Sequence, residues 1–225
     1  MPGSDGLLPG GGDRQRRLIP LFPLPGVVLF PGTLLPLHIF EPRYRVMVSR
    51  ALQGDRILGM SMIDGSGPPD DPPALLALGG AGRIVEQEEL EDGRFNIILE
   101  GAFRYRILAE EPSSPYRSAT VEFVPTRGFP AEAQERSAVA AVRELFGELQ
   151  PAMELPPLPY EALSAERLAG ELALRLRWPA EALQEILATD SLPDRFAAIA
   201  GRLTEWKKTA DFLHPYRGEP NPLEN

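Results

Sequence analysis

The sequence predicts an α+β protein, with a small β barrel in its first half and a carboxy-terminal helical bundle in its second. Apolar runs with strand-like alternation are separated by turn residues as far as Val124, and glycines among them mark places where a sheet can bend into a barrel. From Ala131 on, apolar residues recur at intervals of three and four, which is helical spacing. We therefore expect a disordered tail over residues 1–13, the barrel with one helix over 14–126, the bundle over 131–213 and a second tail over 214–225.

The stretch from Ile19 to Val48 organises the first half of the chain. Proline removes a backbone donor and fixes φ, so the prolines at positions 20, 23, 25, 31 and 36 leave room for short extended pieces. Val27–Phe30 and Leu34–Phe40 are predicted as strands, joined by a turn at Pro31-Gly32. Proline at position 42 suits a first helical turn, and the helical spacing after it predicts a helix over residues 42–53.

Further strands follow this helix. The Asp92-Gly93 pair tolerates the positive φ of a tight turn, so it is predicted to join the two arms of a hairpin. Glycines 79, 80 and 82 are predicted to form bulges, because no Gly-Lys-Ser/Thr sequence or helix start follows them, as a phosphate-binding loop would require. The predicted segments are a strand at Arg56–Ile63, a loop at 64–73, extended chain at Ala74–Leu90, an arm at 94–109 and a strand at Tyr116–Val124.

The arm over residues 94–109 alternates between apolar and polar positions. Odd-numbered residues such as Leu99 and Tyr105 share one phase and are predicted to face the core. Arg104 and Arg106 fall in the opposite phase, and we expect them to lie outside and pair with nearby carboxylates.

Helices are predicted from Ala131, from near Ser164, from Pro179 and from Ser191. Ser191 and Asp194 form a capping-box pattern at the start of the last helix, whose apolar residues then repeat at alternating intervals of four and three. This helix is long enough for its far end to pass beyond a small core. Trp206, with Ala210 and Leu213, is therefore predicted to pack against a second chain, which gives a homodimer, or against a bound partner. Full burial within the monomer is the alternative.

Composition excludes several classes of protein. The chain has 225 residues, which is enough to bury a core without stabilising disulfides or metals. It has no cysteine, which excludes disulfides, thiolate zinc sites and cysteine nucleophiles. A reducing, cytoplasmic location is expected. The net charge of −9 opposes a nucleic-acid partner. No stretch is long and apolar enough for a membrane span, and prolines break the signal-like run after Arg17.

The sequence also lacks the residue patterns that catalysis requires. No Walker A motif is present, and the two lysines, Lys207 and Lys208, lie together on a predicted helix end where neither is desolvated as a serine–lysine dyad requires. Neither His38 nor His214 has metal-ligand spacing to another ligand, and His38 is predicted to be structural. The acidic residues around the hairpin are predicted to be solvated. We expect no catalytic, cofactor or metal site.

Two blocks of sequence resemble a known family. LPLHIFEPRY, residues 35–44, and GGAGRIVEQEELEDGRFNIILEGAFRYRI, residues 79–107, are similar to the Lon-protease amino-terminal domain, also called the LON substrate-binding domain, in its short free-standing form. The resemblance covers residues 18–213. It implies a PUA-like β pseudobarrel followed by a helical bundle, and a role in gripping other proteins.

The leading hypothesis is a non-enzymatic interaction module that binds exposed apolar polypeptide or a partner protein. Candidate contacts are Phe40, Pro42 and Tyr44 at the strand-to-helix junction, and Trp206. Burial in the core is the alternative for the first three. Other hypotheses are an RNA-associated PUA-like protein, an accessory subunit of an ATP-dependent protease acting in trans, and a hydrolase. The RNA hypothesis is opposed by residues 1–126, which hold 12 basic and 16 acidic side chains.

Overall fold

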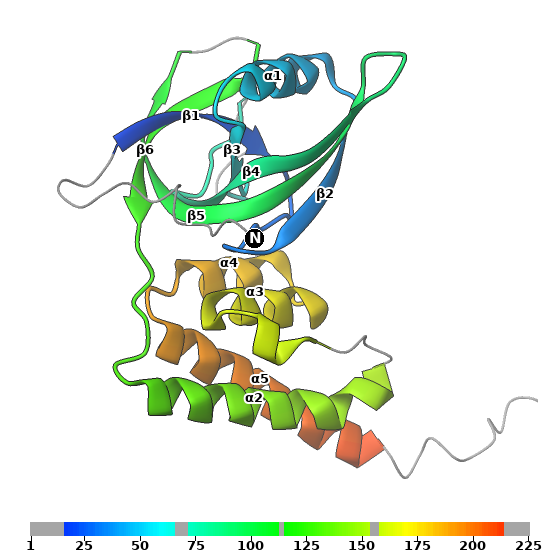
Figure 1. Ribbon diagram of the computed structural model, residues 1–225, viewed down its shortest axis with the longest axis vertical. Coiled ribbons are helices and arrows are strands. Elements are labelled where there is room, and N and C mark those ends of the chain that lie inside the picture. Colours follow the sequence, from blue (N-terminus) through cyan, green and yellow to red (C-terminus); the bar gives the residue numbers. More distant parts are fainter. Residues whose placement is uncertain (1–15, 66–71, 113–114, 154–157, 214–225) are drawn as a thin grey trace, which may run out of the picture. The chain divides into compact units, whose positions relative to one another are not determined.

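The computed structural model describes residues 16–65, 72–112, 115–153 and 158–213 (Figure 1). The predicted tails, and most of the loop predicted at 64–73, lie outside these ranges.

The chain divides into two compact units. Unit 1 holds the residues up to Pro125 together with Arg177–Ala188, and unit 2 holds Thr126–Leu176 and the residues from Thr189 on. The short segment 177–188 therefore belongs with the β structure, although it follows two helices of the other unit.

Unit 1 is built on one six-stranded sheet with the order β2-β5-β4-β3-β1-β6, which an additional β5–β6 pairing closes into a barrel. β2 lies outside the closed ring and pairs with the first half of β5. The helix α1 (Pro42–Gln53) and, from the later segment, α4 (Ala180–Ala188) complete the unit. The strands are β1 (Arg16–Pro23), β2 (Leu34–Ile39), β3 (Ile57–Ser61), β4 (Leu78–Glu89), β5 (Phe95–Glu111) and β6 (Arg117–Val124).

The predicted strand at Val27–Phe30 is wrong, because these residues pair with no strand, although Val28, Leu29 and Phe30 are buried. The strand lies earlier instead, as β1, and includes Pro20. Proline is tolerated there because β1 borders β6 alone over its first residues and meets β3 from Leu21 on, so that Pro20 lies at a sheet edge. The strand Leu34–Ile39 and the helix 42–53 agree with the sequence prediction.

The core of unit 1 has two parts. α1 packs Tyr44, Met47 and Val48 against β-strand residues in the larger cluster. The smaller cluster surrounds Tyr105, whose hydroxyl lies 2.6 Å from Ser61 Oγ and donates to the Met60 carbonyl at 3.0 Å. Burial raises the pKa of this hydroxyl well above its ordinary value.

The alternation predicted for β5 holds at Leu99, Tyr105 and Arg106 but not at Arg104. Leu99 and Tyr105 are fully buried, as predicted. Arg104 is also buried, at 1% exposure, so its predicted outward position is wrong. A register shift opposite Ala81/Gly82 leaves Ala102 unpaired, and α4 supplies a carbonyl on the face where Arg104 lies. A bulge is therefore present opposite Gly82, with its extra residue on β5, whereas the bulges predicted at Gly79 and Gly80 are absent because both residues pair in regular register.

Leu99→Ala should lower the free energy of unfolding by about 2–5 kcal/mol, because it removes a fully buried side chain from the larger core cluster. Leu108→Ala is the control, because Leu108 lies on the same strand but is 42% exposed, and it should lower the free energy of unfolding by less than about 0.5 kcal/mol. Urea denaturation measures both. Equal costs would contradict the assigned faces of β5.

Unit 2 consists of α2 (Glu132–Met153), the short 3-10 helix η2 (Tyr160–Ala162), α3 (Ala165–Arg175) and α5 (Leu192–Leu213). Ser191 Oγ accepts from the Asp194 amide at 3.3 Å, which confirms Ser191 as the helix cap, and the hydroxyl also donates to the Asp194 carboxylate. Leu192, Phe196, Ile199 and Leu203 of α5 are buried.

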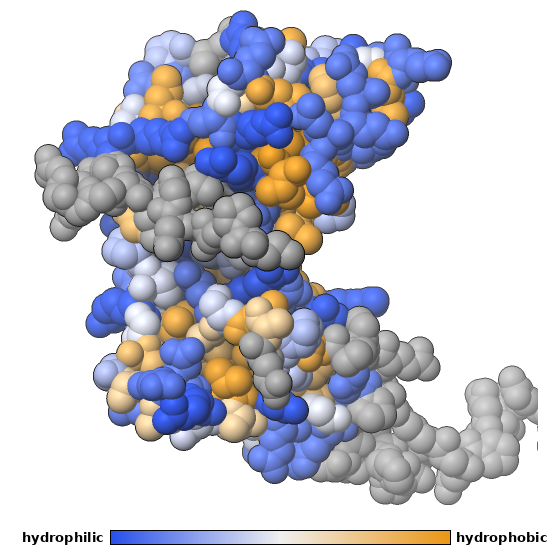
Figure 2. Space-filling view, in the orientation of Figure 1, coloured by the Kyte–Doolittle hydropathy of each residue, from blue (hydrophilic) through white to orange (hydrophobic). Residues whose placement is uncertain are grey.

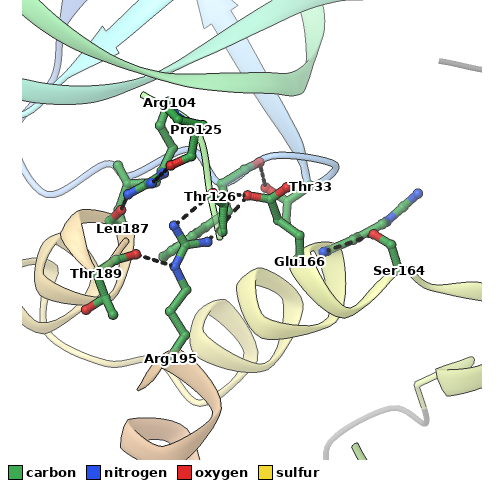
Figure 3. A network of polar contacts seen from close by, with 11 residues as sticks. Thr33, Arg104, Pro125, Thr126, Ser164, Glu166, Leu187, Thr189 and Arg195 are labelled. Carbon is green, nitrogen blue, oxygen red and sulfur yellow. Dashed lines mark hydrogen bonds and ion pairs between the residues drawn. The ribbon is translucent and has the colours of Figure 1, made fainter. Parts of the chain in front are cut away.

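A buried polar network ties the elements of unit 2 together (Figure 3). Arg195, fully buried on α5, donates to the Thr189 carbonyl at 2.8 Å and to Thr126 Oγ1 at 3.3 Å. Glu166 of α3 lies 3.5 Å from the same guanidinium and accepts from Thr126 Oγ1 at 2.6 Å. A charge buried this deeply is tolerated because it is paired and hydrogen-bonded.

Candidate functional site

Apolar side chains are exposed at both ends of β2. Leu34, at its start, is 50% exposed, and Phe40, directly after its end, is 61% exposed. Two large exposed apolar side chains on one strand make this strand a candidate for contact with an apolar partner. Figure 2 shows orange, apolar surface where Figure 1 places β2.

The even-numbered residues of this segment form a continuous exposed row, which we call the β2 strip: Leu34, Pro36, His38 and Phe40. Successive side chains of a strand point to opposite faces, so Leu35, Leu37 and Ile39 turn toward the core instead. The rings of His38 and Phe40 stack with centroids 6.2 Å apart. The strip is thus apolar at its ends and holds proline and an imidazole in its middle.

The backbone of β2 has one unoccupied side in the described part of the chain, where β2 pairs with β5 alone. Gly101 donates to the Thr33 carbonyl at 2.9 Å, which places Thr33 in a hydrogen-bonded pair at the start of the ladder. Such pairs recur at every second residue of an antiparallel ladder, so the odd-numbered residues direct their amides and carbonyls to β5. The even-numbered residues direct theirs to the outer edge, where Pro36 has no amide to offer.

A groove of about 480 Å³ lies on the same face as the β2 strip. Its floor is formed by Pro36 and His38 of β2 and their neighbours Ile98 and Asn96 on β5. Two carboxylates of β4, Glu86 and Glu88, line it as well, and both residues are exposed. The groove therefore offers an apolar centre beside an acidic margin.

The polar side chains of the groove hold one another in place. Arg94 donates to His38 Nε2 at 3.2 Å, so Nδ1 carries the ring proton and donates to Asn96 Oδ1 at 2.8 Å. Asn96 in turn donates to Glu88 Oε2 at 2.8 Å. His38 is therefore hydrogen-bonded, as the sequence predicted, but its side chain is exposed and not packed in the core.

The hairpin beyond the groove has the predicted turn. Gly93 has a φ of 76°, and the carboxylate of Asp92 accepts from the Arg94 amide at 3.1 Å and from its Nε at 2.6 Å. The Arg94 amide in particular lowers the pKa of the Asp92 carboxyl.

The four candidate contacts from the sequence have different environments. Phe40 and Pro42 are exposed in unit 1. Tyr44 is 6% exposed and packs on Phe22 with ring centroids 4.3 Å apart, so its ring is a core side chain and its candidacy as a surface contact is corrected. The reason is the helical phase of α1, which turns Tyr44 inward with Met47. Trp206 is half-buried in unit 2, and the side chains of Ala210 and Leu213 lie outside what the structure describes.

Sequence reasoning did not single out Leu34, Pro36 and His38 as surface residues. The run LLPLHIF is apolar at almost every position, so alternation does not separate its two faces. Proline and histidine at even positions are the one signal that could have identified the exposed face.

Within the described ranges, no group of three or more histidine, cysteine, aspartate or glutamate side chains is placed to hold a metal ion. Among the same residues, none of the helices is both long and apolar enough to cross a membrane.

Together, a closed β barrel with an exposed edge strand and a separate helical unit place the chain in the α+β class. Residues 18–205 match the family model described as the ATP-dependent protease La (LON) substrate-binding domain. The chain belongs to this family, which confirms the resemblance and the fold class inferred from the sequence.

Solved structures and full-length relatives agree with this assignment. The Lon N-terminal domain protein from Xanthomonas campestris superposes with a TM-score of 0.59 at 23% identity, covering 82% of this chain and 98% of that one. The N-terminal domain of the Mycobacterium avium complex Lon protease gives 0.62 at 15% identity, covering 84% and 98%. These likenesses establish the fold.

Among sequence relatives, the Lon protease of Anaeromyxobacter dehalogenans is 24% identical over 189 residues, which are 81% of this chain and 22% of that protein. Lon protease 4 of Sorangium cellulosum is 28% identical over 220 residues, 94% of this chain and 27% of that protein. The chain thus spans about a quarter of the length of these relatives.

Proposed function

We propose that the chain is a non-enzymatic recognition module and that the β2 strip binds exposed apolar segments of unfolded polypeptide or of a partner protein. The observation that supports this most directly is the exposure of Leu34 and Phe40 on one strand whose outer edge is unpaired in the described residues. Membership of a substrate-binding family agrees with it. Phe40 and the neighbouring Pro42 keep the interface role expected from the sequence.

Leu34→Glu and Phe40→Glu should each weaken binding of a fluorescent, reduced and carboxymethylated lactalbumin by about tenfold, because a charge replaces an apolar contact. Fluorescence anisotropy measures the affinity. Leu18→Glu is the matched control, since Leu18 is 61% exposed, as Phe40 is, but lies on β1.

The thermal unfolding midpoints of all three variants should stay close to that of the unsubstituted protein. Equal losses of affinity in the Leu18 and Phe40 variants, or no loss in any of them, would contradict a role for the β2 strip.

The acidic surface beside the groove also supports a protein partner. Over residues 83–100 six carboxylates stand against two guanidinium groups, a balance that repels phosphate. We infer that nucleic acid is not the ligand of this face. The absence of cysteine accords with the reducing cytoplasm as the place of action.

A second contact is proposed on α5 of unit 2, where Trp206 is half-buried. Its neighbour Lys207 pairs with Glu148 of α2 at 2.6 Å, so this part of α5 packs on α2 while the indole keeps an exposed side. Large aromatic side chains in such places often anchor an association surface.

Trp206→Glu should convert a homodimer into a folded monomer. Sedimentation velocity gives the oligomeric state, and circular dichroism shows whether the variant keeps its helices. Lys208→Glu, two residues further along α5 at an exposed position, is the control and should leave the sedimentation coefficient unchanged. Unfolding of the Trp206 variant without any change of oligomeric state in the folded fraction would show that the indole is a packing residue.

A further inference from the structure

We propose that the polypeptide segment bound here adds to the outer edge of β2 as an extended strand and that it alternates apolar with basic residues. This inference rests on the proposed function and specifies the chemistry of its ligand.

The first step is the backbone. The hydrogen bond from Gly101 to Thr33 fixes which residues of β2 bond β5. The backbone amides and carbonyls of Leu34 and His38, and the carbonyl of Pro36, therefore point away from β5. A second bond supports the same phase: the Leu90 amide donates to the Arg94 carbonyl at 2.8 Å, so even-numbered residues of β5 bond β4 and odd-numbered ones bond β2. The outer edge thus offers amides at 34 and 38 and carbonyls at 34, 36 and 38, which is the pattern that an added strand requires.

The second step is the difference between the two faces of β2. On the inner face Leu35 and Leu37 are half-buried and pack on the larger core cluster. A strand added beside them would complete their burial if its residues on that face were apolar.

The opposite face selects positive charge. There the added strand would lie next to Pro36 and His38, at the groove lined by Glu86 and Glu88. The surrounding residues 83–100 contribute six carboxylates and two guanidinium groups, one of which, from Arg94, is already paired with Asp92. Lysine or arginine on this face would meet a complementary field, and the exposed Phe40 ring offers a further contact for a cation. The two faces of β2 together therefore specify a ligand strand whose residues alternate between apolar and basic.

The proline in the middle of the edge fits this arrangement. Proline at an edge strand removes a donor and limits uncontrolled pairing between sheets. With Pro36 between two donors, the added strand makes its paired bonds at Leu34 and His38, so one register is favoured.

The test uses synthetic peptides and the full chain. A peptide of alternating leucine and lysine should bind about tenfold more tightly at low salt than one of alternating leucine and glutamate, and more tightly than a peptide of the same composition with its leucines and lysines in two blocks. Glu86→Lys should abolish the preference for lysine over glutamate. Glu144→Lys, an equal change of charge at an exposed position on α2, should preserve it.

Two N-methylated forms of the leucine–lysine peptide test strand addition itself. Methyl groups on one alternate set of amides block the bonds to β2, whereas methyl groups on the other set point away from it. Strand addition requires that one form bind and the other not. Equal binding of both forms, or of the lysine and glutamate peptides, would overturn the inference.

Failure of the proposed function gives a different result. In that case the lactalbumin affinity itself would not respond to Leu34→Glu or Phe40→Glu. If that affinity does respond while the peptides show no preference, the recognition role stands and the basic, strand-adding ligand is refuted.

Discussion

Arg104→Ala should lower the free energy of unfolding of unit 1 by about 3–5 kcal/mol, although the sequence places this arginine on the outside of its strand. The guanidinium is 1% exposed and donates to the Leu187 carbonyl at 2.8 Å and to the Pro125 carbonyl at 2.6 Å (Figure 3). Alanine would leave two carbonyls without this donor and open a cavity beneath α4. Leu187 also lies in the last turn of α4, where the helix dipole favours a positive charge.

The chain offers a clean measurement of this effect. Its two tryptophans fall in different units, Trp178 in unit 1 and Trp206 in unit 2, so Trp178 fluorescence in a Trp206→Phe background reports the urea unfolding of unit 1. Arg106→Ala, two residues along β5 at an exposed position, is the control and should cost less than about 0.5 kcal/mol. Equal costs for the two arginines would show that Arg104 does not hold α4.

Arg104 also shows where prediction from sequence reached its limit in this fold. Local rules identified the strands with strong alternation, the Asp92-Gly93 turn and the Ser191 cap, because each depends on residues close together in the chain. The burial of Arg104 depends on α4, which lies some eighty residues later and returns to unit 1. An arginine on an alternating strand looks the same whether water or a helix carbonyl faces it.

The candidate site was predictable to a similar extent. The sequence named Phe40 as a candidate contact at the strand-to-helix junction, and its ring is exposed there. It did not separate Phe40 from Tyr44, since the direction of Tyr44 depends on the face that α1 turns to the sheet. The unpaired edge of β2 follows from strand order, which no local pattern of residues specifies.

Gly101→Ala should lower the free energy of unfolding of unit 1 by at least about 4 kcal/mol, and it should also weaken the binding of unfolded polypeptide. A Cβ at this position would lie 1.9 Å from the Phe30 carbonyl oxygen and 3.2 Å from Pro31 Cα, which are backbone atoms that cannot turn aside. Gly80 is in the same position relative to Leu29, the residue before Phe30, because a Cβ on Gly80 would lie 1.9 Å from the Leu29 carbonyl oxygen. The segment that leads from β1 to β2 thus crosses the sheet at two glycines, which explains why Val28, Leu29 and Phe30 are buried without forming a strand.

Gly101 connects this crossing to the candidate site. Its carbonyl accepts from the Gly32 amide at 2.7 Å and its amide donates to the Thr33 carbonyl at 2.9 Å, so it fixes the residues directly before β2. Partial displacement of these residues should shift the β2 strip, and polypeptide affinity should therefore fall at temperatures where Trp178 fluorescence still reports a folded unit 1. Gly147→Ala is the control of opposite sign: nothing lies within 4 Å of its added Cβ, it is exposed in α2, and alanine there should stabilise the helix by about 0.5–1 kcal/mol. If Gly101→Ala left both stability and affinity unchanged, the close crossing of Phe30 over β5 could not be what holds β2 in place.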